Sequence, residues 1–252
     1  MAIEIHRFGD LQQAARALAG AIAADLRQAL LRQPRALLLL SGGRSPVAVF
    51  AALAAESLAW DRVDVSLVDE RSVAPGAPAA NAALVEASLL VDAARAAHLI
   101  ALMPAAVFQA AADPWDAALQ AAARANVDPV LARPDVVVLG MGNDGHTASL
   151  FNDAPQWPEA SMTGSRYVAL QPRAAPHARV SLSLQALQRQ KQCYLWAVGA
   201  DKSATLAGLT QVVKSAQLTA AGVAALAHAG PAVACLIADP ALLLQAYCSD
   251  AA

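Results

Sequence analysis

DVVVLGMGNDGHT (residues 135–147) is the stretch of sequence that decides the fold of this chain. Its first five residues are mostly apolar and predict a buried strand, because a strand covered on both faces shows no alternation of polar and apolar residues. The strand leads directly into a loop with three glycines, Gly140, Gly142 and Gly145. A buried strand followed by such a loop is typical of an α/β protein with a largely parallel sheet.

The alternation of strand and helix continues on both sides of this stretch. Further strands are predicted at residues 36–40, 63–68, 98–102, 180–184, 194–198 and 232–237, and helices at residues 11–31, after Pro46, from Asp113 toward Asn126, around Lys202 and after Pro240. We therefore predict a Rossmann-like α/β fold of three layers, α/β/α, with a mostly parallel central sheet. Since no repeat or long linker divides the chain, we expect one domain over residues 1–252, with residues 151–178 as a candidate elaboration.

Composition argues against several classes of protein. The 252 residues are 57% hydrophobic, but the longest stretch of low charge, residues 220–238, is interrupted by Gly230 and Pro231. We interpret it as a helix, a turn and a buried strand, because a membrane span needs roughly 20 uninterrupted apolar residues. With 18 basic and 20 acidic residues, the charge balance favours neither nucleic acid nor a membrane as partner.

The two remaining compositional signals concern location and metal binding. The first ten residues contain no apolar segment of a signal peptide. The three cysteines, Cys193, Cys235 and Cys248, show no spacing typical of a zinc site. We therefore expect a cytoplasmic protein with reduced thiols and no bound metal.

Three polar clusters follow predicted strands: residues 41–45, 69–71 and 140–147. In open α/β sheets, ligands bind in the crevice outside the carboxyl ends of the strands. We therefore expect the three clusters to meet and form the active site.

The first cluster contains Ser41, Gly42, Gly43, Arg44 and Ser45. Two glycines allow a tight turn that exposes backbone N–H groups, and we expect the helix that follows to begin with Ser45 as its cap and Pro46 in its first turn. A helix N-terminus adds partial positive charge, so the loop suits a phosphate group. It matches neither the dinucleotide-binding fingerprint nor the P-loop, and an ordinary strand-to-helix turn is the alternative.

The third cluster places Asp144 and His146 among glycines, including Gly142. Histidine is the side chain best suited to proton transfer near neutral pH, and an aspartate two residues away can orient the ring. An isolated histidine usually has a structural role, but flanking glycines rarely serve core packing. We therefore predict that His146 transfers protons and that Asp144 assists it.

Other polar residues are candidates for substrate binding. Asp69 and Arg71 emerge from a buried strand, and Asn81 is expected to cap a helix. Arg179 begins a β-like segment, and Lys202 follows Asp201 at the start of a helix. Each basic residue can complete a phosphate clamp; the alternative is a solvated loop or surface charge.

These segments resemble a known family. LSGGRSP, VDER and LGMGNDGHTASLF, in that order, are similar to the motifs of the 6-phosphogluconolactonase family of the pentose phosphate pathway, and RVSLSLQAL and VGADKSATL resemble its two later motifs. The resemblance implies the fold shared with glucosamine-6-phosphate deaminase. It also implies hydrolysis of 6-phospho-D-glucono-1,5-lactone to 6-phosphogluconate.

The resemblance carries over to individual positions. It implies proton transfer by His146 with help from Asp144, and contacts with the substrate phosphate and its surroundings from Gly42, Gly43, Arg71, Arg179 and Lys202. It implies no cofactor. We expect a small sugar-phosphate lactone as the partner and a monomer or weak dimer.

Three alternative functions fit the sequence less well. Glucosamine-6-phosphate deaminases resemble the chain in fold, but they have a catalytic glutamate five residues after the loop histidine, where this chain has Phe151. A non-catalytic sugar-phosphate sensor would carry a helix-turn-helix segment, whereas the first 35 residues hold one long helical pattern. A serine hydrolase would need a GxSxG motif, which the sequence lacks.

Overall fold

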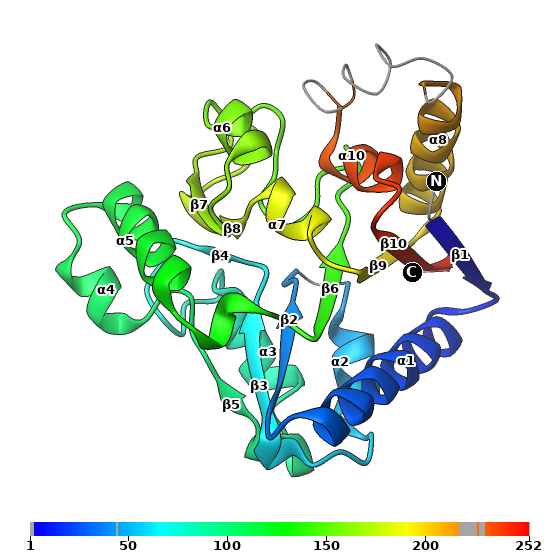
Figure 1. Cartoon of the computed structure of the whole chain (residues 1–252), viewed down its shortest axis with the longest axis horizontal. Coiled ribbons are helices and arrows are strands. Elements are labelled where there is room, and N and C mark those ends of the chain that lie inside the picture. Colours follow the sequence, from blue (N-terminus) through cyan, green and yellow to red (C-terminus); the bar gives the residue numbers. More distant parts are fainter. Residues whose placement is uncertain (1–2, 44, 217–225, 227–229, 252) are drawn as a thin grey trace.

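The computed structural model describes residues 3–43, 45–216, 226 and 230–251. Its main sheet has seven strands in the order β1-β10-β9-β6-β2-β3-β5, and all of their pairings are parallel (Figure 1). The strands are β1 (Ile3–Phe8), β2 (Ala36–Leu40), β3 (Val63–Leu67), β5 (His98–Leu99), β6 (Val136–Gly140), β9 (Gln192–Val198) and β10 (Leu243–Ser249). The prediction of a mostly parallel central sheet is therefore confirmed.

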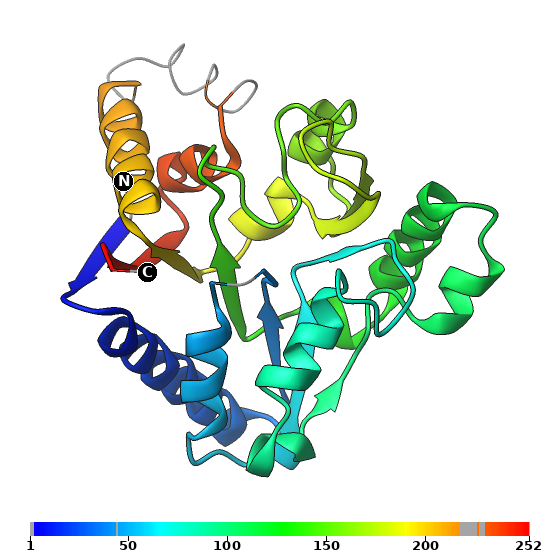
Figure 2. The ribbon, with the colours of Figure 1, turned by 180° about the vertical axis from the view of Figure 1, so that it is seen from behind.

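Helices cover both faces of the main sheet. The helices α1 (Leu11–Arg32), α2 (Val47–Ala54) and α3 (Asn81–Ser88) gather on one side, and α8 (Ala200–Ala216) and α10 (Ala232–Ala238) on the other (Figures 1 and 2). The three-layer α/β/α prediction is thus confirmed. Helix α1 begins directly after Asp10. The side chain of Asp10 accepts a hydrogen bond from the backbone N–H of Gln13 and so caps the helix.

A small antiparallel sheet lies beside the main one. Its order is β4-β8-β7, and its strands are β4 (Asp69–Arg71), β7 (Tyr167–Leu170) and β8 (Arg179–Leu182). Four further helices lie on this side of the molecule: α4 (Ala105–Ala110), α5 (Pro114–Val127), α6 (Trp157–Met162) and α7 (Leu184–Gln188) (Figure 1). Three 3-10 turns complete the described elements: Trp60–Arg62, Asp92–Ala96 and Val130–Ala132. The proline-rich residues 151–178 contribute α6 and β7.

The core explains the order of the strands. All five residues of β2 are buried, as expected for a central strand with helices on both faces. The strand lies between β6 and β3. The carboxyl ends of β6, β2 and β3 are therefore neighbours, and the three polar clusters that follow them converge.

Two predictions near the C-terminus are wrong. Residues 232–237, predicted as a strand, lie in the buried helix α10, and the segment after Pro240, predicted as a helix, forms strand β10. A short apolar run does not distinguish a buried strand from a buried helix. Much of the preceding low-charge stretch, residues 220–225 and 227–229, lies outside the described residues.

Two smaller differences concern the N-terminal half. Residues 3–8, for which no element was predicted, form the edge strand β1. Helix α2 begins at Val47 with Pro46 before it, and no side chain caps it, so the prediction of Ser45 as its cap is wrong. Among the described residues, no helix is both long and apolar enough to cross a lipid bilayer.

Candidate active site

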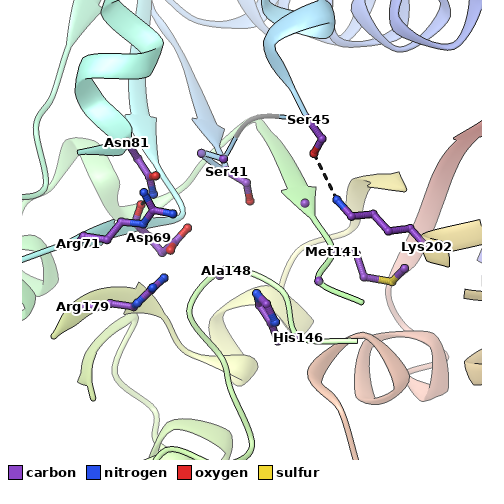
Figure 3. A pocket seen from close by; sticks show the side chains of 14 residues that line it. Ser41, Ser45, Asp69, Arg71, Asn81, Met141, His146, Ala148, Arg179 and Lys202 are labelled. Carbon is purple, nitrogen blue, oxygen red and sulfur yellow. Dashed lines mark hydrogen bonds between the residues drawn. The ribbon is translucent and has the colours of Figure 1, made fainter. Parts of the chain in front are cut away.

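A cavity of about 340 Å³ lies at the carboxyl ends of β2, β3 and β6. It brings together most of the residues predicted from sequence: Ser41, Gly42, Gly43, Ser45, Asp69, Arg71, Asn81, Gly142, His146, Arg179 and Lys202. Asp144 contacts His146 from outside the lining, and Arg44 lies outside the described residues. In Figure 3, Asp69, Asn81 and the two arginines occupy one side of the cavity, Ser45 and Lys202 occupy the other, and His146 lies below them.

The loop after β6 is folded by its own backbone. The N–H of Gly142 donates to the carbonyl of His146 at 2.9 Å, and the N–H of Gly145 donates to the carbonyl of Gly142 at 3.0 Å. A β-carbon on Gly142 would overlap the imidazole ring. Only glycine therefore leaves the space in which the ring of His146 lies.

The side chain of His146 is held by Asp144. Its Nδ1 lies 2.5 Å from Oδ1 of Asp144, and the imidazole is 26% exposed. Because a carboxylate only accepts hydrogen bonds, the proton of a neutral imidazole is placed on Nδ1, and Nε2 keeps a lone pair. A histidine in this state can act as a general base.

The loop after β2 has the features of an anion site. Gly43 has φ +91°, a conformation that favours glycine. Among the described residues, the backbone N–H groups of Gly42 and Gly43 have no acceptor. Nζ of Lys202 lies 3.4 Å from Oγ of Ser45 in the same loop. Burial lowers the pKa of Lys202, as expected for an ammonium group held in a cavity.

Two arginines form the opposite side of the cavity. Arg71 in β4 pairs directly with Arg179 in β8, and like charges on opposing strand positions repel. Arg71 donates to the carbonyl of Ala79 at 2.6 Å, and the Nε atoms of both arginines are buried without a partner among the described residues. Burial lowers the pKa of Arg179, and the neighbouring Arg71 lowers it further, whereas Asp69 opposes the shift. A bound anion would relieve this repulsion.

Asp69 connects the arginines to the loop of His146. Its Oδ2 accepts a hydrogen bond from Oγ of Ser149 at 2.5 Å, and the same hydroxyl accepts one from Nη1 of Arg179 at 3.3 Å. The prediction that Asn81 caps α3 is wrong. Asn81 is the first residue of that helix, and its side chain donates to the carbonyl of Asp69 at 2.8 Å.

The role of Glu70 was not predicted from the sequence. This carboxylate is 1% exposed and accepts hydrogen bonds from the backbone N–H groups of Arg71, Asn81 and Ala82. Burial raises its pKa, and the three backbone bonds oppose that shift. Glu70 thus joins β4 to the start of α3. A charged residue at the end of a buried strand was the sequence signal that could have indicated this role.

Other contributions to the site were not predicted. Gly140, Met141 and Ala148 also line the cavity, and Ala148 has φ +50°, a conformation that costs energy for a residue with a β-carbon. The sequence shows no signal for a backbone conformation of this kind at an alanine. Phe151 packs against His146 with ring centroids 3.8 Å apart. In the part of the chain that the structure describes, no group of three or more His, Cys, Asp or Glu side chains could hold a metal ion.

The chain is similar in sequence to proteins of known family. Residues 9–230 match the family of glucosamine-6-phosphate isomerases/6-phosphogluconolactonase. The chain is 40% identical over 202 residues to 6-phosphogluconolactonase of Neisseria meningitidis serogroup A, covering 79% of this chain and 84% of that protein. It is 41% identical over 203 residues to the enzyme of the same name from Pseudomonas aeruginosa, covering 79% and 82%.

A solved structure with the same name as these relatives is also similar to the chain. The crystal structure of a 6-phosphogluconolactonase from Shewanella baltica superposes with a TM-score of 0.80 at 31% sequence identity. The match covers 97% of each chain. The similarity therefore extends over both sheets and all sides of the cavity.

Proposed function

Because the chain belongs to the family of glucosamine-6-phosphate isomerases and 6-phosphogluconolactonases, we propose that it hydrolyses 6-phospho-D-glucono-1,5-lactone to 6-phospho-D-gluconate in the pentose phosphate pathway. The observation that carries this proposal for the molecule itself is the His146–Asp144 pair, which faces a cavity with cationic groups on two sides. A neutral lactone ring with one phosphate group fits such a cavity. The enzyme is proposed to be a single cytoplasmic domain, a monomer or weak dimer, that needs no cofactor or metal.

The reaction begins with substrate binding. The 6-phosphate lies against the N–H groups of Gly42 and Gly43 and the ammonium group of Lys202. Support for this arrangement comes from the backbone donors of the loop, which have no acceptor among the described residues, and from the contact of Lys202 with Ser45. The sugar hydroxyls face Asp69, Arg71 and Arg179.

Hydrolysis then requires one base that later acts as an acid. Nε2 of His146 takes a proton from a water molecule whose oxygen attacks C1 of the lactone, and a tetrahedral intermediate forms. The bond between C1 and the ring oxygen breaks, and the imidazolium returns the proton to that oxygen as it becomes a hydroxyl. Asp144 holds the ring during both transfers, and a contribution of about 10²- to 10⁴-fold in rate is expected from such proton transfer.

The test compares freshly prepared 6-phosphogluconolactone with the unphosphorylated lactone. Product formation is coupled to a 6-phosphogluconate dehydrogenase or followed by acid release, and the spontaneous rate is subtracted. We expect a large enzyme-dependent rate with the phosphorylated lactone alone. Equal rates on both lactones would contradict the phosphate site, and no rate above background on either would overturn the proposed reaction.

A further inference from the structure

Phe151 lies directly against the proposed base. The centroids of the Phe151 and His146 rings are 3.8 Å apart, and the ring planes are inclined by 25°. Phe151 is 7% exposed, so its ring belongs to the interior of the molecule. A stacked pair of this kind fixes the relative orientation of its two rings.

The hydrogen bond to Asp144 does not fix the imidazole by itself. It constrains one atom, Nδ1, while the plane of the ring can still rotate about that contact. The side chain of Asp144 is also 52% exposed, so it gives little steric support. A second contact is needed to define where Nε2 lies, and the face of Phe151 supplies it.

Phe151 is itself held in place from the substrate side of the cavity. The Cζ atom of Arg179 lies over its ring, 5.3 Å from the centroid, within the range of a cation–π interaction. The same guanidinium contacts Ser149, two residues before Phe151, and the carbonyl of Pro176. The aromatic ring therefore lies between the imidazole and a buried cation that is anchored by two further hydrogen bonds.

We propose that Phe151 is a positioning residue, whose ring fixes the plane of the His146 imidazole so that Nε2 remains directed at the substrate. This inference rests on the proposed function, because it requires His146 to be the proton acceptor. Phe151 itself transfers no proton in the reaction. Its effect is on kcat, since a reacting group displaced by about 1 Å can lose about 10²-fold in rate.

The test uses Phe151→Leu, which removes the aromatic face but keeps an apolar side chain, and Phe151→Tyr, which keeps the ring. For Phe151→Leu we expect kcat to fall by about 10- to 100-fold. KM should remain within about twofold of the original value, as for a group that acts only in the transition state. Phe151→Tyr should retain most of the original kcat. Phe108→Leu in α4 is the matched control, because it makes the same substitution at a half-buried site away from the cavity, and it should leave both constants unchanged.

A spectroscopic measurement separates positioning from a general structural effect. A ring stacked on an aromatic face gives upfield-shifted proton resonances, and those of His146 can be identified by their absence from the NMR spectrum of His146→Gln. The shift should disappear in Phe151→Leu and persist in Phe151→Tyr. An unchanged kcat in Phe151→Leu, a change in KM alone, or unchanged His146 resonances in that variant would each overturn the proposal. If His146→Gln is fully active, the assignment of His146 as the base fails, and the catalytic role of Phe151 fails with it; absence of activity on both lactones in the unsubstituted enzyme is the separate result that overturns the proposed function.

Discussion

Two glycine-containing loops leave neighbouring strands of the main sheet, and they differ in where their backbone hydrogen bonds go. In the loop after β6, the N–H groups of Gly142 and Gly145 donate to carbonyls of the same loop. In the loop after β2, those of Gly42 and Gly43 have no acceptor among the described residues. Glycine thus serves one loop by letting it close on itself around a side chain, and the other by leaving donors available to a ligand.

The comparison assigns the chemistry to the loop after β6 and the binding to the loop after β2. His146→Ala tests the first assignment and should have the largest effect. We expect kcat to fall at least about 10²-fold, because the proton acceptor is removed, while the affinity for the product 6-phosphogluconate is retained. Steady-state kinetics and calorimetric titration measure the two quantities. His98→Ala is the control, since His98 is exposed and pairs with Asp64 at β3; a fully active His146→Ala would contradict the assignment of the chemistry to the loop after β6.

Gly142→Ala sharpens the same assignment without removing the base. The new β-carbon would overlap the imidazole and the carboxylate of Asp144, so the ring must move. A displacement of about 1 Å predicts a loss of about 10²-fold in kcat, with little change in KM. The variant is measured with the same coupled assay. A rise in KM at constant kcat would show that this loop serves binding instead.

Gly42→Ala tests the loop after β2. Its β-carbon would overlap the buried side chain of Asn81, which is fixed by its bond to the carbonyl of Asp69. Overpacking of this kind costs about 1–3 kcal/mol. If that cost falls on substrate binding, about 1.4 kcal/mol corresponds to a tenfold higher KM. Gly20→Ala in α1 is a matched control, because its β-carbon would meet no atom within 4 Å; a loss in kcat alone for Gly42→Ala would reverse the roles of the loops.

The smallest predicted effect is a pH dependence of binding. Burial lowers the pKa of Lys202 from its ordinary value of 10.5. Lysine is charged below its pKa. As the pH rises, Lys202 therefore loses its charge at a lower pH than an ordinary lysine does. The phosphate of 6-phosphogluconate is already doubly ionised above pH 7, since its second pKa is about 6. Calorimetric titration between neutral and alkaline pH should therefore show affinity falling before the ordinary lysine pKa is reached, and Lys202→Arg should keep its affinity to higher pH.

The sequence predicted the centre of the molecule better than its edges. The strands β2 and β6 are continuous apolar runs bounded by polar loops, so their burial on both faces could be inferred. The polar clusters after these strands were expected to meet, and the neighbouring positions of β6, β2 and β3 bring them together. At the other side of the sheet, residues 232–237 are equally apolar but form α10, because their environment is decided by contacts with α8 and α7 that local sequence does not reveal.

The site shows the same division. His146, Asp144 and the glycines could be predicted because glycine around a titratable side chain has few structural explanations. Ser149 could not, because its role depends on Asp69 and Arg179, which are far away in the sequence. The roles of Glu70 and Phe151 depend on the conformation of the loops that follow them or precede them, which the sequence does not reveal. Phe151 was noticed only as the residue that replaces the glutamate of a related enzyme, whereas the structure shows it packed on the base.

The order of the main sheet also has a consequence for the time at which the chain can fold. β1 occupies the edge of the sheet and pairs only with β10 among the described strands, with Ile3 opposite Leu244. Ribosomes add about 5–20 residues per second, so β1 waits on the order of ten seconds or more for its partner. The apolar residues Ile3, Ile5 and Phe8 remain uncovered by the sheet during that interval. Strand β1 thus cannot join the sheet until β10 has been synthesised.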